Sequence, residues 1–169
     1  MKKTAILLGT SNNNGNTHAL VKAVANKVQA TVFNLKDYTI SPFDYQHKNI
    51  DDDFIPLVEE LLEFEHIIFA SPVYWYTMSA QMKVFFDRIS DLLHVKKELG
   101  RKLRGKSSAI LSTGSSPQPM RSFEEVFINS FKYLDMDYKG LLYCFCENNF
   151  DLSTHEENIN MKLVEIAWR

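Results

Sequence analysis

The chain has 169 residues, 45% of them hydrophobic, and its 19 lysine and arginine residues against 21 aspartate and glutamate residues give a formal net charge of −2. This length suits one well-buried core, so we expect a single domain spanning residues 1–169. Charges of both signs are interspersed along the chain, which argues against a nucleic-acid or anionic-membrane partner. No apolar run reaches the roughly 18 residues of a membrane span, and the segment before Gly9 is too short for a secretory signal, so a cytoplasmic location is expected.

Apolar runs alternate with helical patterns along the chain, without internal repeats. Residues 4–8 predict a buried strand, and residues 17–29 predict a helix whose Leu20, Val21, Val24 and Val28 form one apolar stripe. Further strands are predicted at 31–35, 66–70, 108–112 and 138–145. Further helices are predicted at about 55–64, at 79–93, after the loop 113–120, and at 154–168. A polar loop before residue 54 and a basic loop at 96–106 complete the pattern.

Strands of continuous apolar character, each followed by a helix, indicate a parallel sheet covered on both faces. With right-handed crossovers, five such units favour the strand order 2-1-3-4-5, the flavodoxin-like three-layer α/β sandwich. In that arrangement the ligand crevice lies beyond the carboxyl ends of the first and third strands. Unusual loops do follow both strands, at 10–16 and at 71–78.

The first of these loops, within "GTSNNNGNTHAL" at 9–20, has the composition of a phosphate site. A helix beginning near Thr17 offers unpaired N–H groups and a partial positive charge, and Gly15 and the asparagines tolerate left-handed backbone. The hydroxyls of Thr10, Ser11 and Thr17 and the amide of Asn16 can add donors. An ordinary capped turn has the same composition and stays an alternative.

The spacing of the glycines and the absence of lysine in this loop restrict which phosphate-containing ligands it can bind. Gly15 is followed by Asn16 rather than by the lysine of a nucleoside-triphosphate loop, and no glycine lies between Gly9 and Gly15 to complete a dinucleotide fingerprint. A monophosphate therefore fits best.

The block "SPVYWYTMSAQMKVFFDRIS" at 71–90, together with "GTSNNNGNT", resembles the NAD(P)H-dependent FMN reductases and quinone reductases of the flavodoxin-like superfamily. The resemblance implies that the FMN phosphate is wrapped by Ser11, Asn13, Gly15, Asn16 and Thr17. It implies that the isoalloxazine ring lies against Pro72, Val73, Tyr74, Trp75 and Tyr76. A third loop with Thr113, Gly114 and Ser115 is expected at the far edge of the flavin. Family members are commonly homodimers or homotetramers with the active site at the subunit junction.

The resemblance implies an FMN-dependent oxidoreductase that passes hydride from NAD(P)H through FMN to a quinone, a free flavin or a similar small acceptor. Azo dyes, nitroaromatics and metal oxyanions are further acceptor classes. No catalytic side chain is required, because the flavin carries the electrons itself. The alternative is a flavodoxin-type electron carrier without substrate turnover, although such carriers are typically more acidic than this chain.

Other chemically active residues have simpler interpretations. Cys144 and Cys146 are two apart in a predicted strand and are expected to be buried reduced thiols. The histidines lack metal-ligand spacing, so no metal site is expected. Lys83 and Asp87 suit a solvated pair one helical turn apart, and Arg88 suits a subunit contact or helix packing. The acidic residues 51–53 suit capping charges at a helix start.

Overall fold

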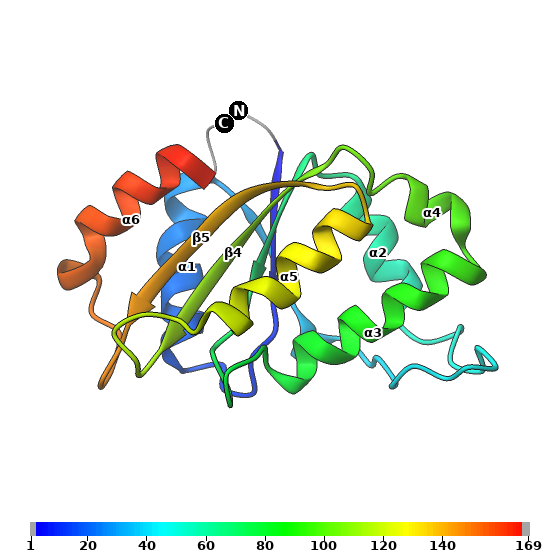
Figure 1. Cartoon of the computed structure of the whole chain (residues 1–169), viewed down its shortest axis with the longest axis horizontal. Coiled ribbons are helices and arrows are strands. Elements are labelled where there is room, and N and C mark those ends of the chain that lie inside the picture. The colour runs from blue at the N-terminus through cyan, green and yellow to red at the C-terminus, as the bar shows by residue number, and fades with distance from the viewer. Residues whose placement is uncertain (1–2, 167–169) are drawn as a thin grey trace.

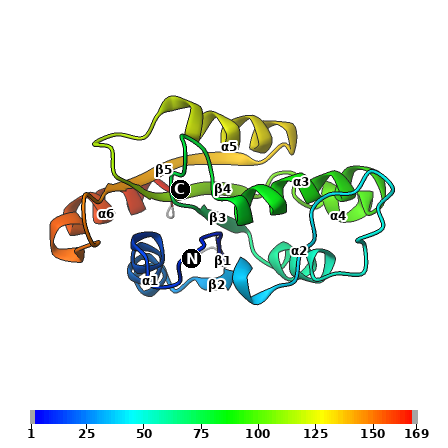
Figure 2. The same cartoon turned by 90° about the horizontal axis from the view of Figure 1, so that it is seen from below.

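A computed structural model describes residues 3–166 of the chain, which form a parallel five-stranded sheet of order β2-β1-β3-β4-β5 (Figures 1 and 2). The strands are β1 (Thr4–Leu8), β2 (Thr31–Asn34), β3 (His66–Ala70), β4 (Ser107–Gly114) and β5 (Asp137–Phe145). The helices are α1 (Asn16–Val28), α2 (Phe54–Leu62), α3 (Ala80–His94), α4 (Lys97–Arg101), α5 (Arg121–Tyr133) and α6 (Leu152–Ile166), with a 3-10 turn at Leu35–Asp37. The predicted fold class and strand order are confirmed.

The two faces of the sheet carry separate hydrophobic cores. Helices α1 and α6 cover one face, and α2, α3 and α5 cover the other (Figure 2). Alternate side chains of β1 divide between them, with Ala5 and Leu7 in one core and Ile6 and Leu8 in the other. This explains why β1 reads as a continuous apolar run, since both faces of a covered parallel strand are buried.

Most element bounds differ from the predicted ones by one or two residues, and three of the differences matter most here. The basic segment 96–106, expected to be a loop, contains α4, whose buried Leu99 anchors it to the core. Strand β4 continues to Gly114, two residues beyond the predicted end, so Thr113 and Gly114 belong to the strand. Helix α6 begins at Leu152 rather than at residue 154, and the last predicted residues, 167–168, lie outside the described residues.

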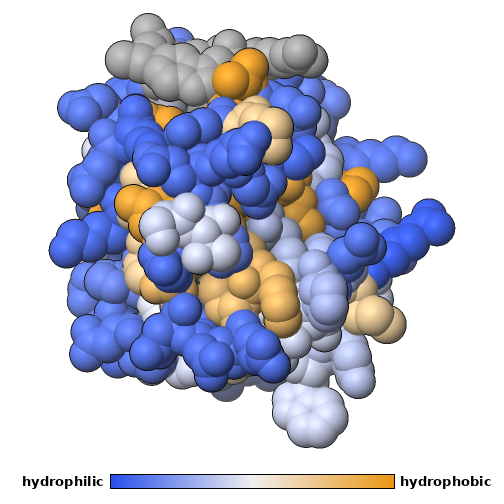
Figure 3. All heavy atoms as spheres, turned by 90° about the vertical axis from the view of Figure 1, so that its left-hand side faces the viewer, coloured by the Kyte–Doolittle hydropathy of each residue, from blue (hydrophilic) through white to orange (hydrophobic). Residues whose placement is uncertain are grey.

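The α6 side of the molecule has a mainly hydrophilic surface, with apolar atoms gathered in its middle (Figure 3). None of the helices within residues 3–166 combines the length and the hydrophobicity needed to cross a membrane.

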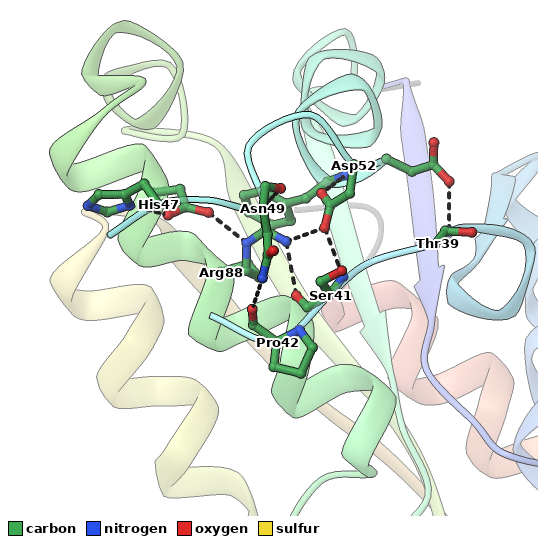
Figure 4. Close-up of polar contacts among 10 residues, drawn as sticks. Thr39, Ser41, Pro42, His47, Asn49, Asp52 and Arg88 are labelled. Atoms are coloured by element: carbon green, nitrogen blue, oxygen red, sulfur yellow. Dashed lines mark hydrogen bonds and ion pairs between the residues drawn. The ribbon is translucent and has the colours of Figure 1, made fainter. Parts of the chain in front are cut away.

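The long polar loop before α2 is held in place by a buried arginine. Arg88 of α3 is completely buried and forms ion pairs with Asp52, at 2.5 Å, and with Asp91, at 2.6 Å (Figure 4). Its guanidinium also donates to the carbonyl oxygens of Ser41 and Asn49, both at 2.9 Å. The expectation of a subunit contact at Arg88 is therefore wrong, because the side chain is inaccessible to another chain.

The acidic residues before α2 do more than the helix capping that was expected of them. Asp52 accepts from the N–H of Phe54 at 3.0 Å, as a capping residue would, but its other oxygen bonds Arg88 and the N–H of Ser41. Asp53 accepts from the N–H of Thr39 at 2.6 Å. The acidic run thus organises the loop as well as the helix start.

Candidate functional site

The carboxyl ends of β1, β3 and β4 bring three loops together at the lower edge of the sheet in Figure 1. Backbone hydrogen bonds continue the sheet pairing into these loops. The N–H of Gly9 donates to Ala70 O at 2.9 Å, that of Ser71 to Leu111 O at 3.0 Å, and that of Val73 to Thr113 O at 3.0 Å. The site is therefore built on extensions of the rigid sheet.

Two buried serines lock the start of α3 to the first loop. Ser79 caps α3 by accepting from the N–H of Met82 at 3.2 Å, and it donates to the carbonyl oxygen of Gly9 at 2.7 Å. Ser71 Oγ accepts from the N–H of Ser79 at 2.9 Å. A Cβ added at Gly9 would meet Met82 Cβ at 2.9 Å, so only glycine permits this close approach.

The side chains of the first loop are used mainly by the protein itself. The amide of Asn16 donates to Asn148 O at 2.7 Å and accepts from the N–H of Phe150 at 2.9 Å. Asn13 accepts from the amide of Asn34 at 3.1 Å. The Thr17 hydroxyl lies 2.7 Å from that of Thr113. The expectation that the Asn16 side chain donates to a phosphate is therefore not supported, since it ties α1 to the loop after β5.

The backbone of this loop also differs from the prediction. Gly15 has φ −88° and ψ 176°, an extended shape open to any residue, and none of the asparagines at 12–14 or 16 has a positive φ. The tolerance of these residues for left-handed backbone is therefore not used in this bend. Gly15 instead allows a close approach, because a Cβ there would lie 3.3 Å from both Asn12 O and Asn12 Nδ2.

Several backbone N–H groups of the bend remain available. Within the described residues, those of Ser11, Asn13, Asn16 and Thr17 have no hydrogen-bond partner, whereas those of Asn12, Asn14 and Gly15 do. Asn16 and Thr17 are the first residues of α1, where free N–H groups and the helix dipole both favour an anion. Donors suited to a phosphate are thus present in the backbone rather than in the side chains.

A hollow of about 480 Å³, here called the first hollow, opens beside this bend. It brings together most of the residues singled out in the sequence, namely Thr10, Gly15, Asn16, Thr17, Pro72, Val73, Tyr74, Thr113, Gly114 and Ser115. Ser11 and Asn13 are not among its lining residues. Asn12 and Asn14, which lie within the predicted phosphate loop, line it as well, together with Cys146 and Asn149, which were not foreseen. The loop after β5 carried no motif, so only its place in the fold reveals Cys146 and Asn149.

A second hollow of about 230 Å³ adjoins the first and shares Val73, Gly114 and Ser115 with it. Trp75 and Tyr76 line this second hollow rather than the first, together with Ser116, Gln118, Pro119, Met120 and Tyr143. The Tyr143 hydroxyl donates to Ser116 O at 2.6 Å, and a Cβ added at Gly114 would lie 2.6 Å from that hydroxyl oxygen. A side chain at 114 would therefore displace the Tyr143 hydroxyl from its place between the two hollows.

The two cysteines are free and buried, as expected. Burial, with a smaller contribution from neighbouring Cys146, raises the pKa of the Cys144 thiol to about 12. Burial also raises the pKa of Cys146. Because only the thiolate is nucleophilic, neither side chain is activated for covalent chemistry at neutral pH. No group of three or more His, Cys, Asp or Glu residues suited to a metal ion occurs within the described part of the chain.

The sheet order, with an anion-suited helix start and three loops at the switch point, defines a flavodoxin-like nucleotide-binding protein. Comparison with known proteins specifies the family, because residues 2–142 match the family model of NADPH-dependent FMN reductase. The chain belongs to this family. It is therefore an NAD(P)H-dependent oxidoreductase with FMN as its cofactor, rather than an electron carrier without turnover.

Individual relatives agree with this assignment. The NAD(P)H-dependent FMN-containing oxidoreductase YwqN of Bacillus subtilis is 27% identical over 148 residues, covering 82% of each chain. The structure of the Trp repressor binding protein from Bacillus subtilis has a TM-score of 0.78 at 20% identity, with 99% of each chain covered. The FMN complex of an FMN-dependent NADH-azoreductase from Bacillus anthracis has a TM-score of 0.73 at 10% identity, covering 100% of this chain and 99% of the other. These structural likenesses show a shared fold.

Proposed function

We propose that this oxidoreductase binds FMN with the phosphate at the start of α1 and the ring toward the second hollow, and that its acceptor is a quinone, a free flavin or a similar small molecule. The observation that carries the proposal is the pair of unpaired N–H groups of Asn16 and Thr17, which line the first hollow, with those of Ser11 and Asn13 on the same bend. Their number and placement suit the several oxygens of one phosphate group.

Binding in this arrangement depends on neutral donors. The described residues lining the first hollow include no lysine, arginine, aspartate or glutamate. The phosphate charge is therefore met by backbone N–H groups and the α1 dipole, with the Thr10 hydroxyl nearby. Pro72, Val73 and Tyr74 on one loop and Thr113 to Ser115 on another provide the surfaces between which the remainder of the nucleotide fits.

The protein's part in the reaction is positional. FMN, when bound, supplies the hydride and electron chemistry, so no side chain has to break a covalent bond. Ser71 and Ser79 fix the loop after β3 against Gly9, and the Val73 N–H bond to Thr113 O fixes it against β4. A framework of this rigidity holds the reacting groups at a constant separation and orientation.

Purified protein tests this proposal directly. The protein should be yellow as isolated, and NAD(P)H oxidation should disappear when FMN is stripped and return when FMN, but not riboflavin, is added. A panel of acceptors run with both NADH and NADPH then identifies the acceptor class and the preferred nucleotide. A colourless protein that does not respond to added FMN would refute the proposal.

We further propose that the protein acts in the cytoplasm as a homodimer or homotetramer, with no nucleic-acid or membrane partner. The free thiols of Cys144 and Cys146 suit a reducing compartment. A hollow of about 350 Å³ between α3 and α5 supports self-association, because its wall includes Phe86, Ile89 and Val126.

A further inference from the structure

The asparagines of the first loop differ in what holds their side chains. The Asn12 side chain accepts from the N–H of Asn14 at 3.0 Å, and that of Asn13 accepts from the amide of Asn34. The side chain of Asn16 is held by two hydrogen bonds to the loop after β5. The side-chain amide of Asn14 makes no hydrogen bond with any described residue, and Asn14 is exposed. It is therefore the asparagine of this bend whose side chain is free to react.

The residue that follows Asn14 makes its side chain chemically labile. Of all the asparagines in the sequence, only Asn14 is followed by a glycine. Asparagine is a thermolabile residue, because the backbone nitrogen of the next residue can attack its side-chain carbonyl carbon. Glycine has no Cβ to shield that nitrogen, so the attack is least hindered in an Asn-Gly pair.

The backbone nitrogen of Gly15 is only lightly held. Its N–H donates to Asn12 O at 3.2 Å, the long end of the usual range, and Gly15 is only partly buried. Gly15 precedes the first residue of α1, so its nitrogen takes no part in the hydrogen bonds of the helix. An exposed bend with so few bonds opens locally at low cost, which frees the nitrogen for the reaction.

We propose that Asn14 is a site of spontaneous deamidation and that the modified residue weakens the binding of FMN. The Gly15 nitrogen forms a bond to Asn14 Cγ while the bond from Cγ to the side-chain nitrogen breaks. Ammonia leaves with the proton that Gly15 gives up, and a five-membered succinimide remains. Water then opens this ring at either of its two carbonyl carbons. Opening at Cγ gives aspartate, and opening at the backbone carbonyl gives isoaspartate.

Both products act against a phosphate at the start of α1. Asn14 lines the first hollow, whose described lining residues include no charged side chain, so a new carboxylate there repels the phosphate without any lysine or arginine to offset it. Isoaspartate also lengthens the backbone directly before the unpaired N–H groups of Asn16 and Thr17 and shifts them relative to that of Asn13. The effect on FMN rests on the proposed function, whereas the reaction at Asn14 does not.

Peptide mass spectrometry measures the reaction in the flavin-free, full-length protein. After incubation at mildly alkaline pH, the tryptic peptide 4–22, which contains every asparagine of the bend, should gain the mass of one amide-to-acid change at Asn14. An isoaspartyl methyltransferase should label the same peptide. Asn14→Gln is the matched control, because glutamine keeps the amide but would have to form a less favourable six-membered ring. Its peptide should be unchanged over the same period.

Fluorescence titration measures the effect on the cofactor. Asn14→Asp should bind FMN about tenfold more weakly than Asn14→Gln, because only the aspartate places a like charge beside the phosphate. The FMN affinity of wild type should fall during incubation, whereas Asn14→Gln should keep the affinity with which it starts. Riboflavin, which lacks the phosphate, should bind the two variants equally.

Other results would overturn the proposal in distinguishable ways. If a synthetic peptide 4–22 reacted while the same segment of the folded protein did not, the fold would protect Asn14. Mass gains spread evenly over the neighbouring asparagines would show that Gly15 does not direct the reaction. Equal FMN affinities of Asn14→Asp and Asn14→Gln would disprove the effect on the cofactor. Fresh wild type that binds no FMN would refute the proposed function and this effect with it, while the mass measurement alone decides the reaction.

Discussion

At the residue scale, Asn16 performs two tasks with different atoms. Its side chain joins the start of α1 to the loop after β5 through Asn148 and Phe150, while its backbone N–H remains unpaired at the proposed phosphate site. Because the two tasks use separate atoms, substitutions can remove one and keep the other.

Asn16→Pro removes the N–H, and Asn16→Ala is its matched control, since both lose the side-chain bonds. Proline is well tolerated at the first position of a helix, and the extended Gly15 suits a residue before proline. A hydrogen bond to a charged group contributes about 1.5–3 kcal/mol, so Asn16→Pro should bind FMN about 10- to 100-fold more weakly than Asn16→Ala. Fluorescence titration measures both, and riboflavin should bind the two variants equally. Equal FMN affinities would contradict an amide-bound phosphate.

The same residues show what sequence can and cannot predict about the site. The position of the bend followed from the strand order, because switch-point loops have a fixed place in such a sheet. Side-chain roles did not follow, since the partners of Asn16 lie 132 and 134 residues away. Left-handed backbone, which Gly15 would tolerate, occurs instead at Trp75 and Tyr76, where residue type favours no such shape.

At the scale of elements, the best-predicted segments are those bounded by clear signals. Strands β1 and β3 match their predicted limits, because continuous apolar runs end at Gly9 and at Ser71-Pro72. Helix α4 was missed because a five-residue helix with one buried side chain has no periodicity to detect. The extension of β4 was missed because Gly114 is paired through the N–H of Cys146, a contact set by β5.

Arg88 of α3 holds the loop that precedes α2, so replacing it should destabilise the fold. Arg88→Met would remove the buried cation from the nearly buried Asp52 and from the buried Asp91, which would keep only its contact with His47, and this should lower the free energy of unfolding by about 3–5 kcal/mol at neutral pH. Lys83→Met on the same helix is the control, because its exposed pair with Asp87 contributes at most about 1 kcal/mol. Urea unfolding measures both. Equal losses would show that the Arg88 cluster contributes no more than a surface pair.

The Arg88 effect should also depend on pH. Burial raises the pKa of Asp52, but the hydrogen bonds from Arg88, Ser41 and Phe54 and the Arg88 charge outweigh it, so the pKa lies below its ordinary value. A depressed pKa stabilises the fold above the unfolded value of about 3.9 and loses this effect as pH falls through the native pKa. The stability difference between wild type and Arg88→Met should therefore shrink toward pH 3, and a constant difference would contradict this linkage.

At the scale of the whole molecule, the two sides carry different surfaces. The α6 side is mainly hydrophilic (Figure 3), whereas the opposite layer has the hollow between α3 and α5, whose wall combines apolar side chains with polar and charged ones. Tyr133 at the end of α5 lines this hollow and is 73% exposed. An isologous dimer would bury such a surface twice, once from each subunit, and stable interfaces of this kind cover about 800 Å² on each partner.

Tyr133→Arg should therefore convert the proposed oligomer to a monomer or a smaller assembly, because it replaces an aromatic contact with a charged side chain in the proposed interface. The fold should be unaffected, since the replaced side chain is largely exposed in the single chain. Asn160→Arg, an exposed substitution on α6 that adds the same charge, is the matched control and should leave the assembly intact. Sedimentation velocity at micromolar concentration distinguishes these outcomes. A wild-type monomer would contradict self-association, and an oligomer that survives Tyr133→Arg would place the interface elsewhere on the molecule.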